Sequence, residues 1–235
     1  MKNLYSFLLQ VKNFFFPAVC ALCGKNLDVF SEIKYGLCTD CSNNITAVND
    51  NTCRICGKPL ISEIEICLSC RNGSGHSYSR QWVLFPYTGK YRELMKKYKF
   101  EKTLSLADFF AEKINDILND PVFSGASIVP VPPRPGKIKN SGWDQVDYLV
   151  KRLEKNYGFP ICRCLKRRKS KIQKRLNRTE RMENLKGRIY MRGAPPKIAV
   201  VIDDVTTTGS TMEVCSSVLK KNGTEVVYGI CLFYD

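Results

Sequence analysis

The 235-residue chain lacks any long uninterrupted run of apolar residues, and it contains a single histidine. No segment reaches the roughly 20 apolar residues that a membrane-spanning helix needs, so we expect no membrane span. Residues 1–19 are apolar but are interrupted by Gln10 and Lys12, and no small-residue cleavage site follows them. This pattern favours an amphipathic N-terminal helix over a signal peptide, and hence a cytoplasmic protein. His76 lies in the flexible-looking stretch RNGSGHSYS, so we expect a surface linker residue without a catalytic role.

Acidic residues are scarce relative to basic ones. The chain has 22 acidic and 37 basic residues, which gives a formal net charge of +15. Such an excess predicts an acidic partner: phosphate groups, nucleic acid or a membrane surface. The hydrophobic share of 44% is enough for a buried core, in one large domain or two modest ones.

Cysteine, by contrast, is abundant, and eight of the twelve cysteines form four C-x-x-C pairs. The pairs are Cys20 with Cys23, Cys38 with Cys41, Cys53 with Cys56, and Cys67 with Cys70. The stretches CALCGKNL and CRICGKPL share the pattern C-x-x-C-G-K-x-L, and each is followed by a plainer second pair. The sequence therefore contains an internal duplication of one unit with two cysteine pairs.

The spacing of these cysteines is typical of metal ligands. Two residues between thiolates let a tight turn direct both sulfurs at one ion, and two such turns complete a tetrahedral site. Soft thiolates favour zinc, with an iron–sulfur cluster, redox chemistry or disulfides as alternatives. The duplication favours local pairing, in which Cys20, Cys23, Cys38 and Cys41 bind one ion and Cys53, Cys56, Cys67 and Cys70 bind the other. The alternative is a crossed arrangement, in which alternating C-x-x-C pairs share an ion. Four thiolates leave no open position, so we expect two structural Zn²⁺ sites.

Residues 1–78 are expected to form one domain, an N-terminal helix followed by a double zinc ribbon. This stretch holds too little apolar sequence to build a core without metal. Zinc binding is therefore expected to be part of its folding.

From residue 79 the pattern changes to alternating strands and helices. The expected strands are 81–87, 126–132, 196–204 and 224–234, and the expected helices are 90–100, 104–118, 143–158 and 210–223. Residues 196–204 form a continuous apolar run, typical of a strand covered on both faces of a parallel sheet. The alternation predicts an α/β fold with a parallel central sheet for residues 79–235. Ligands of such sheets bind at the carboxyl ends of the strands.

The stretch VVIDDVTTTGST places two aspartates and a hydroxyl-rich loop at the end of such a strand. Backbone N–H groups in the loop Thr206–Thr211 can converge on a phosphate, Gly209 allows close approach, and the following helix adds its dipole. Asp203 and Asp204 would be poor phosphate ligands but good acceptors for the vicinal hydroxyls of a ribose. The motif therefore predicts a ribose 5-phosphate site; a strand end followed by a hydroxyl-rich helix cap is the alternative.

This motif resembles the signature with which type I phosphoribosyltransferases bind 5-phosphoribosyl-1-pyrophosphate (PRPP). The chain as a whole resembles the ComF family, in which a double zinc ribbon precedes a phosphoribosyltransferase-like domain. The resemblance extends to the duplicated cysteine pairs and to the stretches KKYKFEKTLSLA, IVPVPPRPGKIKNSGWDQ and SKIQKRLNRTERMENLKG. It implies a role in DNA uptake during natural competence, with other competence proteins as partners.

The resemblance also implies roles for individual residues. The catalytic pair would be Asp203 and Asp204, and the PRPP-binding residues would be this pair with Val205, Thr206, Thr207, Thr208, Gly209, Ser210, Thr211, Arg134 and Lys137. In this set the loop would hold the 5-phosphate, Arg134 and Lys137 would face the pyrophosphate, and Mg²⁺ would bridge pyrophosphate and ribose oxygens. The chain departs from the family at residues 141–145, which read SGWDQ where the family typically reads RGFNQ. Ser141 thus stands where the family has an arginine, and Asp144 stands where it has an asparagine. Lys137 and Lys139 are nearby cations that could compensate for the lost positive charge.

Residues 163–188 form a strongly basic segment, with twelve basic and two acidic residues and thus a local net charge of +10. This density exceeds that of an ordinary solvated surface. The resemblance implies a loop that closes over the active site; a polyanion such as single-stranded DNA is the other expected partner, with salt-dependent affinity. The candidate residues for either role are Arg167, Arg168, Lys169, Lys171, Lys174, Arg175, Arg178 and Arg181.

Two functions follow from the sequence. The first is a phosphoribosyltransferase whose acceptor is unidentified, and the second is a non-catalytic, nucleic-acid-binding competence protein on the same scaffold. One helix and one strand follow the motif, so we expect no C-terminal hood to read a nucleobase. An acceptor would then contact the zinc ribbons, the linker or the basic segment, and we expect the zinc domain to pack over the strand ends.

Overall fold

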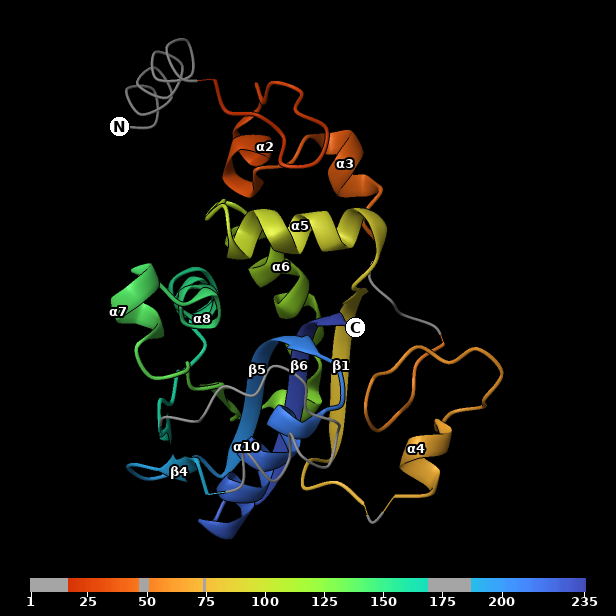
Figure 1. Ribbon diagram of the computed structural model, residues 1–235, viewed down its shortest axis with the longest axis vertical. Helices are drawn as coiled ribbons and strands as arrows, with labels where there is room; N and C mark the ends of the chain where they lie inside the picture. The colour runs from red at the N-terminus through yellow and green to blue at the C-terminus, as the bar shows by residue number, and fades with distance from the viewer. Residues whose placement is uncertain (1–16, 47–50, 74, 169–186) are drawn as a thin grey trace. The chain divides into compact units, whose positions relative to one another are not determined.

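The computed structural model describes residues 17–46, 51–73, 75–168 and 187–235 (Figure 1). The chain divides into two compact units, one made of Met1–Thr46 with Gly89–Phe110 and the other of Ala47–Thr88 with Ala111–Asp235. Residues 1–16 of the expected N-terminal helix lie outside the described ranges, and a domain boundary at residue 78 stays a prediction. Within the described ranges, no helix combines the length and the apolar content that crossing a bilayer requires.

The second unit is built on a parallel sheet of four strands (Figure 1). The strands are β1 (Arg80–Pro86), β2 (Ser127–Pro130), β5 (Ile198–Thr206) and β6 (Val226–Tyr234), in the order β1-β6-β5-β2. In the register of the two inner strands, Asp203 lies opposite Cys231 and Val205 opposite Phe233. The predicted α/β fold with a parallel sheet, preceded by a cysteine-rich region, is confirmed.

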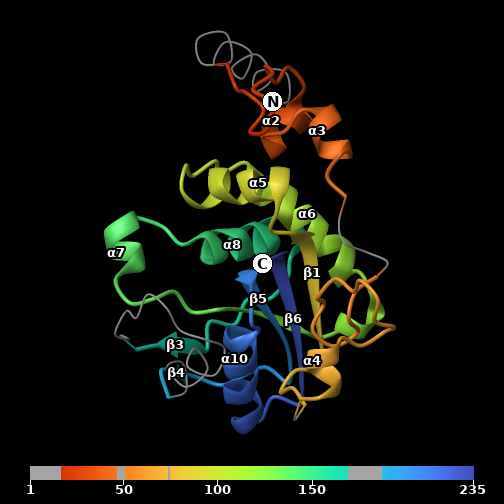
Figure 2. The same ribbon diagram turned by 45° about the vertical axis from the view of Figure 1, so that its right-hand side comes forward.

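Strand β5 is buried on both faces, as its apolar sequence predicts. Ala199 and Val201 belong to the core cluster that also contains Met212 of α10 (Ser210–Lys221). Because side chains alternate along a strand, Val200 and Ile202 point to the opposite face, and both are fully buried. Helix α8 (Gln145–Tyr157) contacts β5 and β2, and Figure 2 shows α10 running along the sheet with β3 and β4 on one side and α4 on the other.

The remaining elements are mostly short, and α6 extends across the boundary between the two units at Phe110. They are α2 (Phe30–Tyr35), α3 (Thr39–Asn43), α4 (Leu68–Arg71), α5 (Gly89–Lys99), α6 (Leu106–Leu118), η1 (Pro121–Phe123), α7 (Lys137–Ser141), β3 (Leu165–Arg167) and β4 (Ile189–Met191). The helices expected at 90–100, 104–118, 143–158 and 210–223 are thus all present. Helix α8 ends at Gly158, whose left-handed φ of 76° gives the glycine terminus that the sequence predicts.

The first zinc ribbon packs against helical segments of its own unit. Lys90 on α5 donates a hydrogen bond to the carbonyl of Asn44, and the Tyr91 hydroxyl donates to the carbonyl of Thr46 at 3.2 Å. A Cβ on Gly36 would overlap the Oγ of Ser105. The ribbon therefore approaches the chain before α6 at a distance that a larger residue would not allow.

The second zinc ribbon packs against the parallel sheet instead. The backbone N–H of Gln81 on β1 donates to the carbonyl of Ile55 at 2.7 Å, and its side-chain Nε2 donates to the carbonyl of Cys56 at 3.1 Å. A Cβ on Gly57 would lie 2.7 Å from the carbonyl oxygen of Gln81. The second ribbon thus contacts strand β1 directly, and the expectation that the zinc domain packs over the strand ends stays a prediction.

The duplication offers a matched pair of glycines for a stability test. Gly24 and Gly57 occupy equivalent positions with φ of 73° and 69°, where alanine costs about 1–2 kcal/mol. A Cβ on Gly24 meets nothing within 4 Å, whereas one on Gly57 meets backbone. We expect Gly57→Ala to cost a further ~1–3 kcal/mol through overpacking. Thermal unfolding of both variants at fixed free zinc checks this, and equal melting temperatures would contradict it.

Candidate functional site

The eight paired cysteines form two compact clusters. Cys20, Cys23, Cys38 and Cys41 make up one, and Cys53, Cys56, Cys67 and Cys70 make up the other. Within each cluster the four sulfur atoms all lie within 4.8 Å of one another. The predicted local grouping is confirmed, and the alternating arrangement is not the one that the chain adopts.

The sulfur geometry fits zinc. A tetrahedral ion with Zn–S bonds of about 2.3 Å separates its sulfurs by about 3.8 Å. The Sγ atoms of Cys23 and Cys38 lie 3.6 Å apart, and those of Cys56 and Cys67 lie 3.8 Å apart. Burial raises the pKa of Cys53, but hydrogen bonds from the backbone N–H groups of Cys56 and Cys67 outweigh it and lower the pKa to about 7. Two zinc-binding sites of four cysteines each, as a double zinc ribbon requires, are thus present.

The predicted acidic pair lies near the end of strand β5. Asp203 is 9% exposed, and its Oδ1 accepts a hydrogen bond from the backbone N–H of Asp204 at 2.8 Å. The Oδ1 of Asp204 in turn accepts from the backbone N–H of Val205 at 2.9 Å. Because neighbouring strand residues point to opposite faces, Asp203 lies on the α10 side of the sheet and Asp204 on the α8 side.

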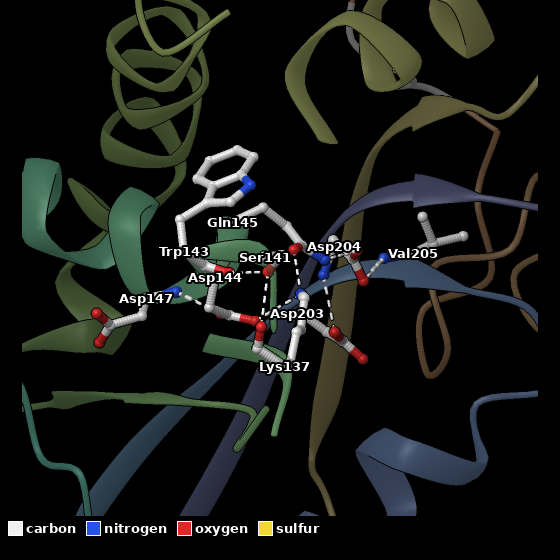
Figure 3. Close-up of polar contacts among 9 residues, drawn as sticks. All are labelled: Lys137, Ser141, Trp143, Asp144, Gln145, Asp147, Asp203, Asp204 and Val205. Carbon is white, nitrogen blue, oxygen red and sulfur yellow. Dashed lines mark hydrogen bonds and ion pairs between the residues drawn. The ribbon is translucent and has the colours of Figure 1, made fainter. Parts of the chain in front are cut away.

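Asp204 belongs to a chain of polar contacts that extends to Lys137 (Figure 3). The Nε2 of Gln145, the first residue of α8, donates to Oδ2 of Asp204, and its Oε1 accepts from Nζ of Lys137. Lys137 also forms an ion pair with Oδ2 of Asp144 at 2.6 Å. The side chain of Asp144 is 3% exposed, so its carboxylate is shielded from water, whereas Lys137 is partly exposed. Lys137, predicted to face a pyrophosphate, is therefore engaged by an acidic residue.

Asp144 has a second task as the N-cap of α8. Its Oδ1 accepts a hydrogen bond from the backbone N–H of Asp147 at 2.9 Å. An N-cap carboxylate satisfies a helix N–H that has no partner within the helix. The acidic residue at this departure from the family pattern thus both begins the helix and holds Lys137.

On the other face of β5, Asp203 interacts electrostatically with Arg167, which in turn interacts with Arg134. Burial lowers the pKa of Arg167, and the positive charge of Arg134 lowers it further, while Asp203 acts in the opposite direction. The Nε of Arg167 is buried without a hydrogen-bond partner among the described residues. The structure therefore places Arg167, a residue of the basic segment, within electrostatic reach of both Asp203 and Arg134.

The predicted phosphate loop leads into α10 with a helix N-terminus suited to an anion. Gly209 is the N-cap, with a left-handed φ of 72°, and no described side chain caps the helix. The hydroxyls of Thr208 and Ser210 hydrogen-bond to each other at 2.8 Å. Backbone N–H groups at such a helix start, with the positive end of the helix dipole, attract phosphate.

His76, which the sequence suggested to be a surface linker residue, is largely buried, and its side chain is 12% exposed. Its Nε2 lies 3.4 Å from the Sγ of the zinc ligand Cys70, and its Nδ1 lies 3.3 Å from Oε2 of Glu213 in the first turn of α10. Glu213 also accepts hydrogen bonds from the backbone N–H and the hydroxyl of Ser77. Burial raises the pKa of Glu213, but the hydrogen bonds from His76 and Ser77 outweigh it and hold that pKa below its usual range. The second zinc ribbon is thus connected to the helix that follows the phosphate loop.

The basic segment is described at its two ends. Strands β3 and β4 are antiparallel, and Arg168 donates through its backbone N–H to the carbonyl of Arg188 at 2.8 Å. The Arg168 guanidinium lies 4.9 Å from the centre of the Tyr190 ring. The other candidates lie outside the described residues: Lys169, Lys171, Lys174, Arg175, Arg178 and Arg181.

Comparisons with known proteins agree with this architecture. Residues 11–71 match the family described as "Double zinc ribbon domain". The chain is 27% identical to Competence protein ComFC of Streptococcus pneumoniae over 220 residues, which cover 88% of this chain and 96% of that protein. It is 26% identical to Competence protein F of Haemophilus influenzae over 224 residues, which cover 91% of this chain and 95% of that protein.

Proposed function

Because the chain belongs to the ComF family, we propose that it binds PRPP with Mg²⁺ and acts as a phosphoribosyltransferase linked to DNA uptake. The observation that carries the proposal is the order of groups at the end of β5: two carboxylates, then a loop, then a helix start without a described side-chain cap. Carboxylates suit hydroxyl donors and a helix start suits a phosphate, so this order matches a ribose 5-phosphate. The names of the two similar proteins support a role in competence.

In this proposal the chain positions a reactive sugar and stabilises charge. The loop Thr206–Thr211 holds the 5-phosphate, while Asp203 and Asp204 accept hydrogen bonds from the ribose hydroxyls. An acceptor forms a bond to C1 as the bond between C1 and the pyrophosphate oxygen breaks, and pyrophosphate leaves with the bonding electrons. Mg²⁺, when bound, neutralises part of the pyrophosphate charge. Arg167, which interacts electrostatically with both Asp203 and Arg134, supplies positive charge on the Asp203 side of the sheet.

Removal of the acidic pair tests the ribose site. Asp203→Asn/Asp204→Asn should lower the affinity for PRPP and Mg²⁺ by at least about tenfold, because charge-assisted hydrogen bonds to the hydroxyls are lost. Isothermal titration calorimetry measures this. As a control, Asp116→Asn/Asp147→Asn removes two carboxylates of the same unit that are more exposed than Asp203. This double variant should leave the affinity unchanged. Absence of PRPP binding by the wild-type protein would exclude the proposal.

Asp144 offers a test of the pyrophosphate side. Asn caps a helix about as well as Asp, so Asp144→Asn should preserve α8 while it releases Lys137 from its ion pair. We expect the affinity for magnesium pyrophosphate, measured by calorimetry, to rise by roughly three- to tenfold, and Lys137→Met in the same background to cancel the rise. Asp147→Asn is the matched control within α8. An unchanged affinity in Asp144→Asn would show that Lys137 does not contact the pyrophosphate.

The basic segment favours single-stranded DNA binding as a second candidate function, with or without turnover of PRPP. Twelve basic residues in 163–188 are enough to neutralise several backbone phosphates. We expect DNA affinity to fall steeply with salt, and the triple substitution of Arg175, Arg178 and Arg181 by alanine to reduce the slope of log affinity against log salt by about 2. Fluorescence anisotropy at several salt concentrations measures the slope. A salt-independent affinity, or no binding at low salt, would remove this function.

A further inference from the structure

A cavity of about 230 Å³ lies between the second zinc ribbon and the loop that follows β5. Lys58 and Ser69 of the ribbon line one side, and residues Thr206, Thr207, Thr208 and Gly209 line the other. Tyr78 and Gln81, which connect the ribbon to the sheet, line the cavity as well. The aspartate pair is not part of its lining. The cavity therefore extends from the phosphate loop toward the zinc ribbon and away from the ribose carboxylates.

Two buried polar atoms in this lining have no hydrogen-bond partner among the described residues. They are the hydroxyl oxygen of Tyr78, a residue 4% exposed, and Oε1 of Gln81, a residue 2% exposed. The Tyr78 hydroxyl lies 3.9 Å from the position that a Cβ on Gly209 would occupy, so it points at the start of α10. The Gln81 amide is fixed because its Nε2 donates to the carbonyl of Cys56. Buried polar groups are almost always hydrogen-bonded in native proteins, so these two atoms call for a ligand.

The charges around the cavity favour an anion on the loop side. The start of α10 presents backbone N–H groups with the positive end of the helix dipole, and Lys58 adds a full positive charge. None of the described lining residues carries a carboxylate. Three zinc ligands, Cys56, Cys67 and Cys70, also line the cavity. Four thiolates with one Zn²⁺ keep a net negative charge, so an anion is favoured on the loop side and beside Lys58.

We propose that this cavity binds a sugar phosphate, with Lys58 and the Tyr78 hydroxyl donating hydrogen bonds to the phosphate group from the ribbon side. The backbone N–H groups after Thr206 bind the same phosphate from the loop side. The inference rests on the proposed function in that the phosphate is the 5-phosphate of PRPP. It adds that the second ribbon is part of the ligand site as well as a structural element.

The duplicated sequence supplies the control. Lys25 in CALCGKNL is the counterpart of Lys58 in CRICGKPL, but it belongs to the first unit, where its Nζ lies 3.8 Å from Oδ2 of Asp40. Lys25→Met and Lys58→Met change the net charge by the same amount at equivalent positions of two zinc ribbons. A difference between them therefore reports the location of the lysine and not the overall charge of the protein.

Calorimetry on the zinc-loaded full chain tests the proposal, with inorganic phosphate, ribose 5-phosphate and PRPP as the probes. Lys58→Met and Tyr78→Phe should each weaken binding of all three by roughly tenfold, as expected for loss of one hydrogen bond to a charged group. Lys25→Met should leave all three affinities unchanged. Zinc content and circular dichroism of each variant establish that the ribbons are intact.

The outcomes separate this inference from the proposed function. If PRPP binds and depends on the aspartate pair, but Lys58→Met matches the wild type or matches Lys25→Met, the inference is overturned and the proposed function stands. If phosphate and ribose 5-phosphate bind in a manner that depends on Lys58 and Tyr78 while PRPP does not bind, the inference stands and the proposed function fails. Absence of binding by all three probes overturns both.

Discussion

The functional groups of the candidate site take their positions from the parallel pairing of β5 between β6 and β2. The hydrogen-bond ladder fixes the point at which β5 ends, and the alternation of side chains sends Asp203 and Asp204 to opposite faces. Helix α10 can begin at Gly209 because the strand stops at Thr206. The positions of the two carboxylates and of the start of α10 are therefore consequences of one strand that is buried along most of its length.

The two zinc ribbons show how one sequence unit acquires two structural roles. Both have C-x-x-C-G-K-x-L and both gather four sulfurs, yet the first contacts α5 and the second contacts β1. The cluster of four sulfurs is common to both ribbons, whereas the neighbouring elements differ. Around the second ribbon these neighbours include His76 and Glu213, which connect a zinc ligand to the first turn of α10.

The helices, the strands of the parallel sheet and the two cysteine clusters could be predicted from the sequence, because they depend on local patterns. The apolar run before Asp203, the glycine after Tyr157 and the two-residue spacing of the cysteines are all readable without tertiary contacts. The ion pair between Lys137 and Asp144 could not be predicted from the sequence, because it depends on how the turn at Gly142 brings α7 against the start of α8. The role of His76 was missed because its partner Glu213 lies 137 residues away along the chain.

The second ribbon also covers part of a sheet edge. Among the described strands, β1 pairs with β6 alone, and the backbone N–H of Gln81 donates to the carbonyl of Ile55 of the ribbon. Exposed strand edges pair with other chains and promote aggregation. If the turns of this ribbon depend on bound zinc, loss of the metal would uncover this edge of the sheet.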